Sequence, residues 1–139
     1  MPNASNLYAG VAGYVGRAGQ QGLIGVFSRQ AGSDTWDHHV KDFEAYTVDV
    51  HPTDPSVIFA GTSDGVYRST DKGETWSRFD KVQVHGTIMS IGLHHSDPKQ
   101  VYIGARYDGE VFGTQDGGVT WQALPLPGEV QHIYAIACG

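Results

Sequence analysis

Residues 48–76 read VDVHPTDPSVIFAGTSDGVYRSTDKGETW, and residues 91–121 read IGLHHSDPKQVYIGARYDGEVFGTQDGGVTW. The two stretches align along their whole length once one or two residues are allowed as an insertion in the second. A looser copy precedes them, so that Trp36, Trp76 and Trp121 lie 40 and 45 residues apart. A repeat of roughly 40–50 residues is typical of the four-stranded blades of a β-propeller.

Each repeat divides into short β-strands at its Pro, Ser, Asp and Gly residues. The second and third copies predict strands at 46–50, 57–61, 66–69 and 75–78, and at 88–93, 101–105, 111–114 and 120–124. The first copy has no first strand at its own start. Residues 132–138 (HIYAIAC), at the other end of the chain, match the first strand of the second copy.

We therefore predict an all-β fold, a β-propeller built of four-stranded blades, with three blades in a single unit over residues 1–139. The predicted blades are 6–40 with a strand equivalent to 131–138, then 43–80, then 86–126. Known propellers have roughly four to eight blades. Two arrangements stay open: two chains that close a six-blade ring as a homodimer by exchanging the C-terminal strand, or a piece of a longer propeller.

Composition agrees with this fold class and excludes several functions. Glycine accounts for 19 of 139 residues and charged residues for 17%, whereas about 25% charge is usual. Nine Lys and Arg against fifteen Asp and Glu give a net charge of −6, so binding to nucleic acid or to anionic membranes is not expected. The single cysteine, Cys138, excludes an intrachain disulfide. Without a signal-like N-terminus or a long apolar run, a cytoplasmic protein is expected.

Two segments carry the pattern S/T-x-D-x-G-x-T-W at the same place in the repeat. The matching residues are Ser69, Asp71, Gly73, Thr75 and Trp76, and Thr114, Asp116, Gly118, Thr120 and Trp121. This pattern resembles the Asp box, or bacterial neuraminidase repeat. Proteins with such repeats include sialidases, xyloglucan-cleaving glucanases, sortilin-type receptors and photosystem II assembly factors.

The Asp-box residues are expected to be structural. In the hairpin between the third and fourth strands, Asp71 and Asp116 can accept hydrogen bonds from backbone N–H groups. Gly73 and Gly118 can supply a positive φ. The resemblance implies that this hairpin lies on the face opposite the catalytic centre, so the motif indicates a fold and no substrate.

Little in the chain matches sialidase chemistry. The Arg-Ile-Pro signature of that enzyme class is absent. Other glycosidases need two carboxylates about 5–10 Å apart. Asp42 and Glu44 are weak catalytic candidates because they open a first strand near the central channel. Asp64 and Asp108 stand at equivalent positions before a glycine and are more simply explained as turn residues.

The seven histidines form no H-x-x-x-H or H-E-x-x-H pattern. His51 and His94 occupy equivalent turn positions, which indicates a shared turn role. Neighbours such as His38 and His39 point to opposite faces of a strand. Neither a metal site nor a cofactor is predicted.

First strands line the axis of a propeller, and their starts meet at the mouth of the channel. The aligned residues there differ between copies (Glu44, Thr87 and His132) although the surrounding pattern is kept. They are expected either to line a wetted channel or to form a polar, aromatic pocket. The predicted ligand-binding residues are Arg17, Glu44, Tyr46, His85, Arg106, Tyr107, His132 and Tyr134.

The sequence thus predicts a scaffold that binds a ligand or protein at the channel mouth, with a small molecule, a glycan or a protein as the bound partner. The alternative is a glycoside hydrolase-like enzyme or carbohydrate-binding module whose site is shared between chains.

Overall fold

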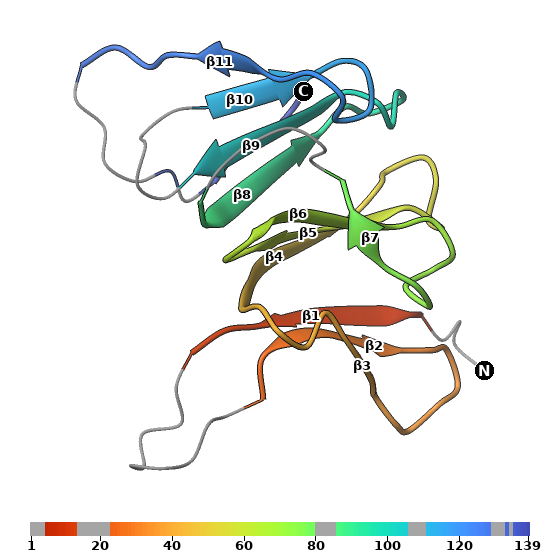
Figure 1. Cartoon of the computed structure of the whole chain (residues 1–139). Helices are drawn as coiled ribbons and strands as arrows, with labels where there is room; N and C mark the ends of the chain where they lie inside the picture. Colours follow the sequence, from red (N-terminus) through yellow and green to blue (C-terminus); the bar gives the residue numbers. More distant parts are fainter. Residues whose placement is uncertain (1–4, 14–22, 80–85, 106–110, 129–132, 134) are drawn as a thin grey trace.

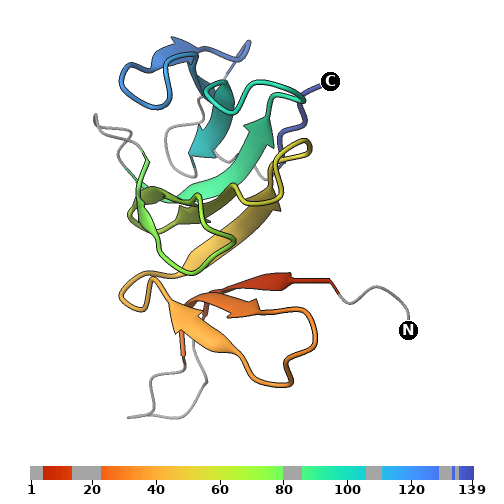
Figure 2. The same cartoon turned by 90° about the vertical axis from the view of Figure 1, so that its right-hand side faces the viewer.

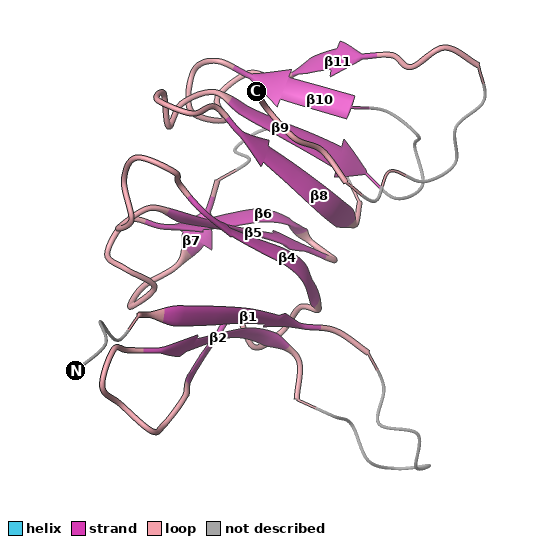
Figure 3. Ribbon diagram, turned by 180° about the vertical axis from the view of Figure 1, so that it is seen from behind, coloured by secondary structure: helices cyan, strands magenta, loops and turns pink. Residues whose placement is uncertain are grey.

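The structure is a computed structural model that describes residues 5–13, 23–79, 86–105, 111–128, 133 and 135–139. These residues form strands, turns and loops without a helix (Figures 1 and 3), which confirms the all-β class. Three antiparallel sheets, called blades 1 to 3 from here on, follow one another along the chain and lie in a stack. The described part of the chain contains no helix that could span a membrane.

Each blade is a simple up-and-down sheet. Blade 1 contains β1 (Leu7–Val11), β2 (Gly25–Arg29) and β3 (Asp37–His39). Blade 2 contains β4 (Ala45–Val50), β5 (Ile58–Thr62), β6 (Gly65–Ser69) and β7 (Ser77–Arg78). Blade 3 contains β8 (Ile88–Leu93), β9 (Val101–Ala105), β10 (Val111–Thr114) and β11 (Gln122–Leu124).

The strand register shows which residues of the blades are equivalent. Leu7 pairs with Arg29, Ile58 with Ser69, and Val101 with Thr114, so β1, β5 and β9 correspond. Among the described residues, blade 1 therefore has no strand equivalent to β4 and β8, as the repeat predicts. Both of these first strands pair irregularly near their starts, between Ala45 and Thr47 and between Ile88 and Ser90.

Glycines let neighbouring blades approach closely. A Cβ atom on Gly61 would lie 2.8 Å from the carbonyl oxygen of Ile88, and one on Gly10 would lie 3.1 Å from that of Ala45. Gly104 is the equivalent glycine of β9, and a Cβ there would lie 2.6 Å from Cγ2 of Ile133. The separation at Gly61 is shorter than real Cβ contacts with backbone, so β5 needs glycine there, and the separation at Gly10 is tighter than most such contacts.

The main core lies between blades 2 and 3. Phe59 and Phe79, both buried, meet edge to face with their ring centroids 4.9 Å apart, and Phe79 meets Trp121 in the same way at 6.1 Å. A smaller cluster between blades 1 and 2 contains Val26, Ala45 and Ala60 with Trp76 packed against it. Each tryptophan of blades 2 and 3 thus covers apolar surface of the preceding blade.

The C-terminal residues depart from the expected strand at 132–138. The described ones, 133 and 135–139, pair with no strand in the described part of the chain. They run beside blade 3 (dark blue in Figure 2), where Ile133 is buried on Gly104 and Ile136 packs on Gly92. The strand without a first-strand partner, β1, lies at the far end of the stack, out of reach (Figure 1).

Candidate functional site

The two hairpins with the S/T-x-D-x-G-x-T-W pattern, residues 69–76 and 114–121, are closed by their own polar groups. In the first, the Ser69 hydroxyl donates to Asp71 at 2.7 Å and accepts from the amide of Gly73 at 2.8 Å. Asp71 also accepts from the Thr75 amide at 2.8 Å and the Thr75 hydroxyl at 2.5 Å. The Trp76 indole donates to the Gly73 carbonyl at 3.0 Å.

The second hairpin repeats these bonds. Asp116 accepts from the Thr114 hydroxyl at 2.8 Å and from the Thr120 amide at 2.9 Å, and Trp121 donates to the Gly118 carbonyl at 3.1 Å. Hydrogen bonds from threonine hydroxyls, then from threonine amides, lower the pKa of Asp71 and of Asp116 to about 2. The carboxylates are therefore committed to the turn, and this end of the blades, the hairpin end, offers no free acid or base among these residues.

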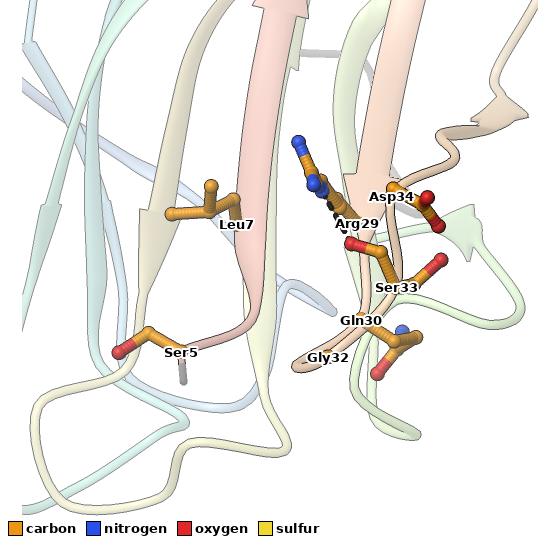
Figure 4. A pocket seen from close by; sticks show the side chains of 7 residues that line it. All are labelled: Ser5, Leu7, Arg29, Gln30, Gly32, Ser33 and Asp34. Atoms are coloured by element: carbon orange, nitrogen blue, oxygen red, sulfur yellow. Dashed lines mark hydrogen bonds between the residues drawn. The ribbon is translucent and has the colours of Figure 1, made fainter. Parts of the chain in front are cut away.

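Blade 1 closes its hairpin in another way. Arg29 stands where Ser69 stands in blade 2, and its Nε donates to the carbonyl of Ser33 at 2.6 Å. Ala31 replaces the aspartate, and its amide donates to the Asn6 side chain at 2.7 Å. Figure 4 shows the resulting hollow of about 510 Å³, lined by Ser5, Leu7, Arg29, Gln30, Gly32, Ser33 and Asp34.

The opposite end of blade 2 carries the predicted catalytic candidates. Glu44 immediately precedes β4, and its carbonyl accepts from the amide of Ser63, which fixes the start of β4 beside the β5–β6 turn. The Tyr46 hydroxyl donates to Oε2 of Glu44 at 2.6 Å. Tyr46 lies at the irregular pairing between Ala45 and Thr47, and bulges of this kind commonly redirect side chains next to active sites.

A third carboxylate lies at the same end, in the β5–β6 turn. Asp64 accepts from the Tyr67 hydroxyl at 3.2 Å and from the Arg78 guanidinium at 3.0 Å. Its own amide donates to the hydroxyl of Thr62 at 3.0 Å. Asp64 is thus a turn residue whose carboxylate is also tied to β6 and β7.

A groove separates the outer strands of blades 1 and 2. Its volume is about 330 Å³, and its lining residues are His39, Val40, Lys41, Asp42, Phe43, Tyr67 and Trp76. The rings of Phe43 and Tyr67 stack with their centroids 5.8 Å apart, and the ring centroids of His39 and Trp76 are 6.5 Å apart. Burial, above all, lowers the pKa of His39 below its usual value.

Residues 40–44 join the groove to the Glu44–Tyr46 pair. This linker leaves β3 at the outer edge of blade 1 and enters β4, the first strand of blade 2. Exposed Asp42 lines the groove, whereas half-buried Glu44 bonds to Tyr46. The two catalytic candidates therefore lie on one linker with different surroundings.

The structure brings together only part of the predicted ligand-binding set. Glu44 and Tyr46 are in contact. The other predicted residues, Arg17, His85, Arg106, Tyr107, His132 and Tyr134, lie outside the described residues. The aromatic groove was not predicted, because its residues come from β3, the linker, β6 and the hairpin of two different blades. One available signal was the pair Phe43 and Tyr67, large aromatic residues that flank polar loops.

His51 and His94 have local roles in equivalent turns. Nδ1 of His51 accepts from the Thr53 amide at 3.2 Å, and Nδ1 of His94 accepts from the Ser96 amide at 3.2 Å, which agrees with the shared turn role expected for them. Across the described ranges, no three His, Cys, Asp or Glu side chains gather closely enough to hold a metal ion.

Comparison with known sequences gives one family and several relatives. Residues 64–137, about half of the chain, match the model of the family described as "Sortilin, neurotensin receptor 3". Xyloglucanase Xgh74A of Acetivibrio thermocellus is 28% identical over 100 residues, with 55% of this chain and 12% of that protein covered. A probable oligoxyloglucan-reducing end-specific xyloglucanase of Neosartorya fischeri is 29% identical over 83 residues, with 55% and 10% covered. The chain thus spans about a tenth of these relatives.

Solved structures confirm the propeller fold. An ancestral GH74 enzyme superposes on 97% of this chain with a TM-score of 0.63 and 19% identity. The GH74 xyloglucanase of Xanthomonas campestris superposes on 91% with a TM-score of 0.68 and 17% identity. The matched part makes up 20% and 22% of those two chains.

Proposed function

The chain belongs to the Sortilin-Vps10 family, and from this premise we propose that it is an Asp-box propeller unit that recognises β-glucan chains of the xyloglucan type. Its site is the groove of blades 1 and 2 together with Asp42, Glu44 and Asp64. The two related xyloglucanases support the substrate class. The hydrogen bonds within residues 69–76 and 114–121 support the Asp-box assignment.

One observation carries the proposal: aromatic rings and the carboxylate of Asp42 line one groove, and the hydroxyl of Tyr67 in that groove donates to Asp64. Phe43 and Tyr67 stack beside the groove, and Trp76 lines it. A sugar ring has an apolar C–H face, which can lie on an aromatic ring, and hydroxyl groups, which can donate to carboxylates. A pocket of apolar walls with a few placed polar groups is the usual form of a small-ligand site.

The test for recognition measures binding of the full chain to xyloglucan by affinity electrophoresis and calorimetry. Phe43→Ala and Asp42→Asn are expected to weaken binding about tenfold or more, because each removes a groove contact. Asp97→Asn, a change in the exposed turn before β9, is the matched control and should bind normally. Xyloglucan binding that is absent, or that survives both groove changes, contradicts the proposal.

A second candidate function is hydrolysis of the bound glucan, favoured by the unequal surroundings of two carboxylates on one linker. Glycosidases use one carboxyl group as an acid and a second as a base or nucleophile. Glu44, held by Tyr46, and exposed Asp42 supply such a pair. Release of reducing ends from xyloglucan that Glu44→Gln and Asp42→Asn each abolish supports hydrolysis. Binding without release assigns the chain to recognition alone.

The broader proposal of a ligand-binding scaffold at the channel mouth rests on Glu44 and Tyr46 together with residues outside the described part. Glycan binding that a change at Tyr46 leaves intact would assign the binding site to the groove and not to the channel mouth. If Tyr46→Phe instead abolishes binding, the channel mouth is the site.

A further inference from the structure

The outer face of blade 1 is apolar and exposed. Leu7 is 50%, Leu23 68% and Trp36 44% exposed. Ala9, Val11, Leu23, Phe27 and Trp36 line a hollow of about 330 Å³ with almost no polar surface. An apolar face of this kind marks a binding surface in a soluble protein.

The internal repeat shows what covers such a face. Trp76, the equivalent of Trp36, packs on blade 1 with its ring 6.5 Å from that of His39. Trp121, the next equivalent, packs on blade 2 with its ring 6.1 Å from that of Phe79. His39 and Phe79 occupy the same position, three residues after the tryptophan of their own blade, and in blade 3 that position is Leu124. Leu124 is 40% exposed, so blade 3 has the residue that should cover Trp36.

A tyrosine makes a second contact between blades 1 and 2, and its equivalent in blade 2 is Phe59. The Tyr8 hydroxyl of β1 donates to the carbonyl of Lys72 at 2.8 Å, and its ring lies against Gly73. Tyr102 is the equivalent residue of β9. In blade 1, Gly32 and Ser33 are the equivalents of Lys72 and Gly73, and Gly32 has a φ of 82° where Lys72 has 62°. These two residues line the hollow of Figure 4. Gly73 has a φ of 88° and Ser33 has no positive φ, so blade 1 keeps only the first of the two turn residues, Gly32.

The C-terminal residues have the packing of a first strand. Ile133 fills the space at Gly104 as Ile88 does at Gly61 and Ala45 does at Gly10. Meanwhile β1 is an edge strand, and no first strand covers it in the described part of blade 1. In blades 2 and 3, Val50 pairs with Ile58 and Leu93 pairs with Val101. The same register places Cys138 opposite Leu7.

We propose that two copies of this chain associate head to tail and close a six-blade ring. Blade 3 of each copy covers the outer face of blade 1 of the other, with Leu124 on Trp36 and Tyr102 at Gly32. Residues 133–138 add to β1 of the other copy as its missing first strand. A head-to-tail contact forms a closed ring when its rotation closes, and six blades lie within the roughly four to eight of known propellers.

The first test is the mass of the full chain in solution, measured by light scattering over a range of concentrations. A particle of about twice the chain mass of 15.0 kDa is expected. A monomer at every concentration, or a ladder of larger species without a stable dimer, overturns the proposal.

The second test reads the register directly. Val50 and Ile58 form a non-hydrogen-bonded pair, because the next pair outward, His51 and Val57, is bonded from the His51 amide to the Val57 carbonyl. Side chains are closest in non-hydrogen-bonded pairs. Oxidised Leu7→Cys is therefore expected to form a disulfide with Cys138 of the other copy and to run as a dimer on a non-reducing gel.

Two controls make this test specific. Tyr8→Cys moves the thiol to the other face of β1, so this variant should not form a disulfide with Cys138 of the other copy. Adding Cys138→Ser to Leu7→Cys should abolish the dimer band. Cross-linking of Tyr8→Cys as readily as Leu7→Cys, or a disulfide within one chain, contradicts the register.

A third test weakens the contact without touching the interior of the chain. Trp36→Ala and Leu124→Ala are each expected to raise the dissociation constant of the dimer about tenfold or more, as aromatic anchors do at protein interfaces. Val119→Asp is the control, since Val119 is 46% exposed and lies outside the proposed contact. If the dimers of Trp36→Ala and Val119→Asp have similar dissociation constants, the outer face of blade 1 is not the interface.

Discussion

Asp71 and Asp116 act at the scale of single residues by holding their hairpins through the threonine immediately before the tryptophan. Their pKa of about 2 is lower than the value of about 3.9 for an unfolded chain. Since the folded-state pKa is depressed, the charged form stabilises the fold fully above about pH 4. That stabilisation is lost as the pH falls through the range from about 4 to about 2.

We therefore expect the unfolding temperature to fall steeply below about pH 4. Thr75→Val removes the hydroxyl that does most to lower the pKa of Asp71. The unfolding temperature of this variant should be a few degrees lower at pH 6, and it should fall less steeply as the pH is lowered below about 4. Thr75→Ser keeps the hydroxyl and serves as the control. Circular dichroism melts at several pH values measure all three proteins, and equal slopes would show that Asp71 does not carry the effect.

At the scale of elements, the second strand of each blade controls the distance to the next blade. Gly61 lies in the middle of two buried layers, where an added Cβ would meet backbone, the carbonyl oxygen of Ile88. Gly113 in β10 differs, because its nearest neighbour would be the Tyr102 ring at 3.0 Å, and a side chain can move.

Gly61→Ala should accordingly lower the free energy of unfolding by about 1–3 kcal/mol, the range found for overpacked cores. Gly113→Ala should cost clearly less, although both changes add one methyl group to a strand. Urea titrations of the two variants measure the difference. Equal losses would mean that blade spacing is not set at Gly61.

The elements were also the most predictable level of the structure. Turn residues between apolar runs placed the strands of blades 2 and 3, and β5 and β9 lie within a residue of their predicted ranges. The fourth strands are shorter than predicted, since β7 contains only Ser77–Arg78. Hydrogen bonds within the hairpin hold Thr75 and Trp76 in the turn. The spacing of apolar residues, from which the strands were predicted, does not contain these bonds.

At the scale of the whole molecule, the buried aromatic rings couple blades 2 and 3. Phe79 is 2% exposed and touches Phe59 of its own blade and Trp121 of the next. The guanidinium of Arg68 lies 5.0 Å above the ring of Phe79. This ring therefore belongs to the core that joins blades 2 and 3.

Phe79→Ala is expected to destabilise the protein by about 3–5 kcal/mol, the usual cost of emptying a buried aromatic site. Tryptophan fluorescence in a urea titration should then show blade 3 unfolding before the rest. Leu126→Ala, a change at a side chain that is 40% exposed, is the control. A single transition with unchanged midpoint would show that Phe79 does not couple the blades.

The candidate site was predictable only in part, for reasons of distance along the chain. Glu44 and Tyr46 are two residues apart at the start of β4, so the sequence alone brings them close together. His39, Phe43 and Trp76 share a groove because blade 2 packs on blade 1, and a local pattern does not contain that packing. Trp76 belongs to the predicted hairpin motif, but its place in the groove depends on how blade 2 packs on blade 1.

The glycines at positions 10, 61 and 104 also explain how these repeats tolerate sequence drift. Where backbone meets the neighbouring blade directly, the spacing between blades depends on peptide geometry rather than on side-chain volume. Copies can therefore diverge in sequence, as the first copy has, while each duplicated unit still fits the next. The spacing of the array is thus set at a few glycine positions in each copy, which leaves other surface positions of the blade free to change.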